Sequence, residues 1–95
     1  MPAYALGFLR FKDADRYHTY SRALAPLLQA HGARLLAGDN HPLALAGPPC
    51  DRVVLLEFAD RDAALRLFES PEYARIAQDR DAGAHVQLQL VNGGA

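Results

Sequence analysis

The chain has 95 residues, of which 51% are apolar and 22% charged, and these values predict a single globular domain over residues 1–95. The net charge of −1 leaves no excess of basic residues for a phosphate backbone, so we expect no nucleic-acid partner. The single cysteine excludes an internal disulfide bond, and without a signal peptide or an apolar run long enough to span a membrane we expect a cytoplasmic protein with no membrane partner.

The first half of the chain predicts a strand, a helix and a second strand. Residues 3–11 are nearly all apolar, which is typical of a strand covered on both faces. Asp13 is placed to cap a helix whose apolar residues recur at spacings of three, four and seven, and Gly32 ends that helix. Residues 33–37 predict the second strand, which ends at a glycine and leads into a loop rich in proline and glycine.

The second half predicts a strand, two helical segments and a last strand. Residues 52–59 are the clearest strand of the chain. Asp60 then caps a short helix, and Ser70, followed by proline at the first helical position, starts another helix that ends at Gly83. Residues 85–91 alternate strictly between apolar and polar side chains, which predicts the final strand.

The order of these elements predicts an α+β fold, the ferredoxin-like βαββαβ plait, with a four-stranded antiparallel sheet and the helices on one face. The strands carry apolar residues on both faces, as Leu6 and Phe8 oppose Ala5 and Leu9 in the first of them. A monomer would leave a large apolar patch on the open face of the sheet. We therefore expect a homodimer in which the two sheets face each other.

Polar side chains also fall on the open face of the predicted sheet. By alternation they are Arg10, Arg34, Glu57, Gln87 and Gln89, with His85 at one end. Polar groups on a face that a partner covers must find partners of their own. This arrangement predicts a small cavity between the two sheets.

Several motifs together are similar to those of a known family. They are Met1-Pro2-Ala3-Tyr4, Tyr17 and Tyr20, Gly32-Ala33-Arg34, Asp51-Arg52-Val53-Val54, Glu57-Phe58 and Ser70-Pro71-Glu72-Tyr73. With them the chain resembles, over essentially its whole length, the bacterial domain-of-unknown-function family thirteen-thirty of the dimeric α+β barrel superfamily. The resemblance implies the ferredoxin-like fold and a barrel-forming dimer, and it implies no established reaction.

The chain departs from the pattern of this family at two places. The family usually has a second glycine where Ala33 stands, and an Arg-Gly-Gly stretch where this chain has Ala37-Gly38-Asp39. Relatives in the superfamily include cofactor-free monooxygenases, haem-degrading enzymes and lactone isomerases. The fold alone therefore does not select a function.

Two charged residues of the predicted open face, Arg34 and Glu57, are the first candidates for catalysis. Arginine can hold a carboxylate or an enolate, and a partly buried glutamate can move a proton. The alternative is a structural salt bridge that fixes the register of the dimer. His85 is a third catalytic candidate, as a base, although a histidine at the start of a strand is more often a solvated side chain.

The predicted substrate-binding residues come from the same face, from the mouth of a strand and from the helices. They are Arg34, Arg52, Glu57, Tyr17 and Tyr73. Arg52 lies at the mouth of its strand, where an ion pair at the surface or at an interface is the alternative role. For Tyr17 the alternative is a core residue with its hydroxyl at the edge, and for Tyr73 it is packing next to the helix cap.

No metal site is predicted, because His18, His31 and His41 share no metal-ligand spacing, and no motif for a cofactor is present. Two hypotheses follow. In one, a homodimer binds a small carbonyl or oxygenated compound in the cavity between the sheets, or is purely structural. In the other, the protein is a cofactor-free enzyme of monooxygenase or isomerase type that uses Arg34 and Glu57. The residues do not choose between these hypotheses.

Overall fold

The computed structural model describes residues 1–94 of the chain. Over this part the elements follow the predicted order, including the two helical segments of the second half. Their bounds are β1 Ala3–Phe11, α1 Ala14–Ala30, β2 Arg34–Asp39, β3 Arg52–Phe58, α2 Arg61–Phe68, α3 Pro71–Gly83 and β4 Ala84–Asn92. No helix in residues 1–94 has both the length and the apolar character needed to cross a bilayer.

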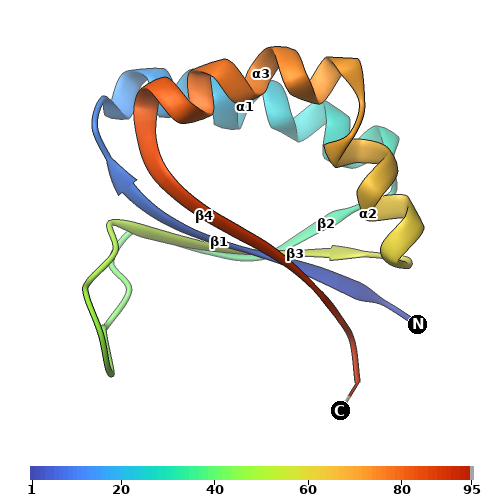
Figure 1. Cartoon of the computed structure of the whole chain (residues 1–95), viewed down its shortest axis with the longest axis horizontal. Coiled ribbons are helices and arrows are strands. Elements are labelled where there is room, and N and C mark those ends of the chain that lie inside the picture. The colour runs from blue at the N-terminus through green and yellow to red at the C-terminus, as the bar shows by residue number, and fades with distance from the viewer. Residues whose placement is uncertain (95) are drawn as a thin grey trace.

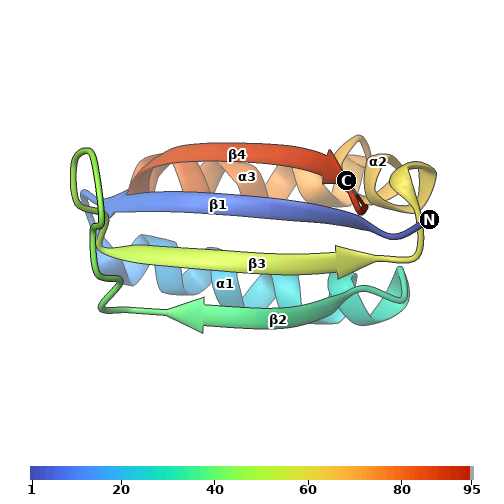
Figure 2. The same ribbon diagram turned by 90° about the horizontal axis from the view of Figure 1, so that it is seen from below.

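The strands of the described residues form one four-stranded antiparallel sheet in the order β2-β3-β1-β4. The helices cover one face of this sheet, with α1 and α3 side by side above it (Figure 1). Figure 2 views the opposite face, over which no helix of residues 1–94 passes. The loop between β2 and β3 projects to this open side, at the lower left of Figure 1. The predicted ferredoxin-like α+β fold is confirmed.

Alternation along the strands divides the apolar residues between the two faces as expected. In β1, Ala5 and Leu9 are 1% and 2% exposed and belong to the core beneath the helices. Leu6 and Phe8 point to the open face and are only partly covered. Phe58 of β3 is fully buried on the helix side. The sheet thus has one face in the core and one apolar face that no other part of the described chain covers.

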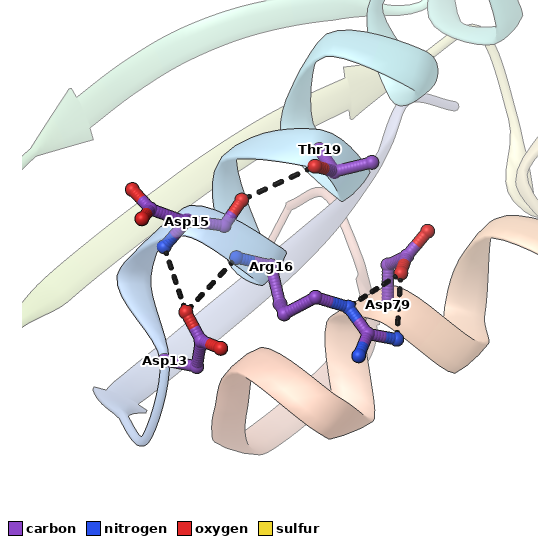
Figure 3. A network of polar contacts seen from close by, with 5 residues as sticks. All are labelled: Asp13, Asp15, Arg16, Thr19 and Asp79. Atoms are coloured by element: carbon purple, nitrogen blue, oxygen red, sulfur yellow. Dashed lines mark hydrogen bonds and ion pairs between the residues drawn. The ribbon is translucent and has the colours of Figure 1, made fainter.

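The helix caps that the sequence predicts are present. The Asp13 side chain accepts hydrogen bonds from the backbone N–H groups of Asp15 and Arg16, at 3.1 and 3.3 Å. Arg16 then forms an ion pair with Asp79 at 2.9 Å, which joins the start of α1 to α3 (Figure 3). Ser70 accepts from the backbone N–H of Tyr73 at 3.1 Å and so starts α3.

Helix α1 ends through a glycine in the left-handed region. Gly32 has a φ of 67°, its N–H donates to the carbonyl of Gln29, and the N–H of Ala33 donates to the carbonyl of Leu28. These two bonds satisfy carbonyl groups that would otherwise lack partners at the end of the helix. Gly32 is therefore the helix stop that the sequence predicts.

Strand β2 differs from the prediction because it does not end at Gly38. It starts at Arg34, contains a register shift between Leu35 and Ala37, and continues through Gly38 to Asp39. The bulge gives the strand an extra residue and lets Gly38 still pair with Val54 of β3. Glycine is compatible with a strand where another group approaches the backbone closely. At Gly38 that group is the side chain of Arg52.

Candidate functional site

A cavity of about 360 Å³ lies between α1 and the helix side of the sheet. Its walls are mostly apolar, and the side chains that line it from α1 include the small Ser21 and Ala25. Gly7 of β1 contributes to the floor, and a Cβ atom there would lie 2.7 Å from a methyl group of Val54. Small residues on both sides thus leave space between helix and sheet that larger side chains would fill.

Two tyrosines of α1 form part of the wall of this cavity. Tyr17 and Tyr20 are 4% and 6% exposed and both line it. Burial raises the pKa of the Tyr17 hydroxyl above its usual value, and the nearby Arg52 guanidinium opposes that rise. Burial also raises the pKa of Tyr20, with Tyr73 adding to the effect. Both hydroxyls therefore keep their protons at neutral pH, and that of Tyr20 shares a hydrogen bond with the Tyr73 hydroxyl at 2.8 Å.

Arg80 of α3 lines the same cavity and is fully engaged by its neighbours. It donates from Nε to one oxygen of Asp81 at 2.9 Å and from Nη1 to the Tyr73 hydroxyl at 3.0 Å. Its guanidinium carbon also lies 5.7 Å from the centre of the Tyr73 ring. Burial acts to lower the pKa of Arg80, but the hydrogen bonds to Asp81 and Tyr73 raise it overall. Arg80 is therefore a neutralised, structural cation.

Arg52 is the second arginine of the cavity, and its surroundings differ. Its Nη1 donates to the side-chain oxygen of Asn40 at 2.7 Å. Its Nη2 lies 2.5 Å from the position that a Cβ atom would occupy at Gly38. Among residues 1–94 Arg52 forms no ion pair. The guanidinium thus rests on the glycine of β2, and no carboxylate of residues 1–94 lies within ion-pair distance of it.

The predicted pair Arg34 and Glu57 lies on the open face, outside this cavity. The two residues are opposite each other in the β2–β3 register, and Arg34 Nη2 is 2.6 Å from Glu57 Oε1. The Arg34 side chain is 69% exposed and that of Glu57 26%. In the single chain this is a surface salt bridge, and such pairs contribute little to stability. Whether these residues act in a site stays a prediction.

A shallower hollow of about 450 Å³ opens on the same face of the sheet, beside the loop that precedes β3. Arg10 and His85 line it, directly opposite each other in the β1–β4 register, together with Phe8, Gln87 and the half-buried Cys50. This hollow lies where the sequence places a cavity between two sheets. No cluster of three or more His, Cys, Asp or Glu side chains in the described part of the chain is arranged to hold a metal ion.

The structure therefore divides the predicted site residues between two faces. Tyr17 and Arg52 line the cavity, and Tyr73 stands behind it, bonded to Tyr20 and Arg80. Arg34, Glu57 and His85 lie on the open face. Sequence reasoning missed Arg80, although it follows Tyr73 by seven residues and so falls on the same side of α3.

Several proteins of known structure share this fold. A protein of unknown function from Rhodopseudomonas palustris superposes with a TM-score of 0.85 at 20% identity, covering 99% of this chain and 83% of that one. A dimeric ferredoxin-like protein of unknown function from Jannaschia sp. CCS1 gives 0.75 at 15% identity, covering 98% and 100%. SnoaB, a cofactor-independent oxygenase from Streptomyces nogalater, gives 0.61 at 15% identity, covering 99% and 94%.

These identities establish a shared fold and not a shared activity. No curated protein matches the chain. Residues 2–94 match the family described as "Domain of unknown function (DUF1330)". The predicted resemblance is thereby confirmed, and this chain belongs to the DUF1330 family.

Proposed function

We propose that this protein binds a small organic compound with carbonyl or other oxygen atoms in the cavity between α1 and the sheet. The observation that carries the proposal is the convergence of Tyr17, Tyr20 and Arg52 on a cavity that is otherwise mostly apolar. Binding sites for small molecules typically combine a concave apolar wall with a few placed polar groups, in volumes of roughly 300–1,000 Å³. The protonated tyrosine hydroxyls supply donors for a carbonyl oxygen.

The test uses two probes with the same bicyclic apolar body, naphthoate and naphthamide, which carry a carboxylate and a neutral amide. At least one of them should bind by calorimetry and perturb the NMR signals of Ser21 and Val54. Ala25→Phe should abolish binding, because the new ring fills the cavity from α1. Ala74→Phe, at an exposed position of α3 outside the cavity lining, is the matched control and should leave binding intact. Failure of both probes to bind would remove this proposal.

A homodimer formed through the open face is the second part of the proposal. Its support is the partly exposed apolar surface of β1 and β3, together with Leu43 and Leu45, which are 84% and 91% exposed on the loop at that side of the sheet. Structural neighbours such as the Jannaschia protein are described as dimeric. In such a dimer the hollow beside Arg10 and His85 would be covered by the partner.

A location in the bacterial cytoplasm belongs to the same proposal, in line with the single unpaired cysteine.

Cofactor-free oxygenation is a second candidate function, which the fold shared with SnoaB favours. In this alternative Arg34 and Glu57 act at the covered open face, where they lie 2.6 Å apart. An oxygen electrode with naphthohydroquinone as the probe tests it against a protein-free blank. Oxygen uptake above the blank that Glu57→Gln removes and Ala25→Phe preserves would support it. Uptake that matches the blank would eliminate it for this substrate class.

A further inference from the structure

We propose that the ligand of the cavity is an organic anion with a planar oxyanion group, such as a carboxylate or an enolate, and that Arg52 is the residue that binds it. This inference rests on the proposed function, since it names the class of compound that the cavity takes. It adds a residue-specific role, and it separates the roles of the two arginines that line the cavity.

The first argument is the contrast between the two arginines of the cavity. Arg80 has a carboxylate, Asp81, at 2.9 Å and an aromatic ring beneath it, so its charge is compensated within the protein. Arg52 is also half-buried against the apolar walls, but its hydrogen-bond partner is the neutral side chain of Asn40. A partly desolvated guanidinium without a counter-ion is unfavourable unless an anion is supplied from outside.

The second argument is that the neighbourhood holds Arg52 in place without neutralising it. Asn40 binds one nitrogen of the guanidinium, and the missing side chain of Gly38 gives room to another. A planar group fixed at one end can offer its remaining donors as a fork that matches two oxygens of one oxyanion. Gly38 and Asn40 are thus positioning residues, and Arg52 is the binding residue.

The third argument is the chemistry next to Arg52. The Tyr17 hydroxyl lies close enough for the guanidinium to influence its ionisation, and both groups line the cavity. An uncharged phenol beside an uncompensated guanidinium offers two kinds of donor to the same oxyanion. The apolar floor from β1 and β3 would receive the hydrocarbon part of the ligand. The arrangement therefore selects an amphipathic anion over a neutral compound of equal size.

The experiment compares naphthoate with naphthamide by calorimetry, at the same pH and salt concentration. We expect the wild type to bind naphthoate at least about tenfold more tightly, because only the carboxylate offers a charge to Arg52. Arg52→Gln should weaken naphthoate about 10- to 100-fold and leave naphthamide unchanged. Arg22→Gln removes the same charge from an exposed position of α1 outside the cavity lining, and it should change neither affinity.

Gly38→Ala tests the positioning role without removing a charge. The three atoms nearest to the added methyl group all belong to the far end of the flexible Arg52 side chain, so the variant should fold normally. It should lower the affinity for naphthoate and not that for naphthamide. A melting temperature near that of the wild type, together with this selective loss, distinguishes positioning from a general structural defect.

The possible failures are distinct. If both probes bind equally and Ala25→Phe abolishes both, the cavity is a binding site and the anion inference is overturned. If Arg52→Gln and Arg22→Gln weaken naphthoate to the same extent, the effect is one of net charge and the role of Arg52 is overturned. If neither probe binds the wild type, the proposed function fails and this inference fails with it.

Discussion

The hydroxyl groups of Tyr20 and Tyr73 lie 2.8 Å apart and join α1 to α3 at the side of the cavity. The two residues are 53 positions apart in the sequence, and they are 6% and 4% exposed. Arg80 donates a further hydrogen bond to Tyr73. The hydrogen bonds that link Tyr20, Tyr73 and Arg80 thus fix one wall of the candidate site.

Two buried tyrosines of α1 make the stability of the protein sensitive to alkaline pH. Burial raises the pKa of Tyr20 and of Tyr17 in the folded state. A group with a raised folded-state pKa contributes stability fully below its unfolded pKa, near 10 for tyrosine, and loses it as the pH rises further. The urea midpoint should therefore fall above about pH 10. Tyr20→Phe should make this fall smaller, and a midpoint that does not change with alkaline pH in the wild type would contradict the account.

Gly83 lies so close to α1 that no side chain fits there. A Cβ atom on Gly83 would be 2.4 Å from the backbone nitrogen of Tyr17. The carbonyl of Gly83 accepts hydrogen bonds from the N–H groups of Lys12 and Asp13. Gly83→Ala should destabilise the fold by about 1–3 kcal/mol in urea unfolding, since backbone must move.

Gly32→Ala is the comparison variant for Gly83. Its cost comes from the left-handed φ of 67°, with no atom within 4 Å of the new methyl group. Amide hydrogen exchange should separate the two mechanisms. Exchange at Lys12 and Asp13 should accelerate in Gly83→Ala beyond what the loss of global stability explains, and it should not do so in Gly32→Ala.

Two adjacent leucines of β3 test the two faces of the sheet. Leu56 is 3% exposed beneath the helices, whereas Leu55 points to the open face. Leu56→Asp should prevent folding, because an unpaired charge in the core costs several kcal/mol. Leu55→Asp should give a folded monomer, seen by circular dichroism together with light scattering after size exclusion. A wild-type protein that is already monomeric at micromolar concentration would refute the facing-sheet dimer.

The ion pair of Arg34 and Glu57 should matter for association more than for the single chain. With Arg34 69% exposed, the pair is worth less than about 1 kcal/mol in a monomer. In a dimer that covers the open face, Glu57→Gln would leave a buried arginine without its partner and weaken association. Sedimentation across a dilution series measures this effect. Arg34→Met combined with Glu57→Leu should restore much of the dimer association that Glu57→Gln loses. If Glu57→Gln leaves association unchanged, the ion pair has no role in the interface.

The contiguous sequence determined the elements and their faces. Asp13, Ser70 and Gly32 mark helix ends through bonds with residues only two to five positions away, so local chemistry specifies them. Alternation in β1 and β3 likewise assigns each side chain to a face, because the pleat fixes a period of two. The fold, the order of elements and the open apolar face follow from such short-range rules.

Only the tertiary structure decided on which side of the sheet the cavity lies and which groups enter it. The cavity exists because α1 stands off a sheet that carries Gly7 at its centre, and no local pattern encodes that spacing. Arg52 meets Gly38 through the β2–β3 pairing, and Tyr20 meets Tyr73 through the packing of α1 on α3. Contacts between distant segments are set by how whole elements pack, and so the site could not be read from any one of them.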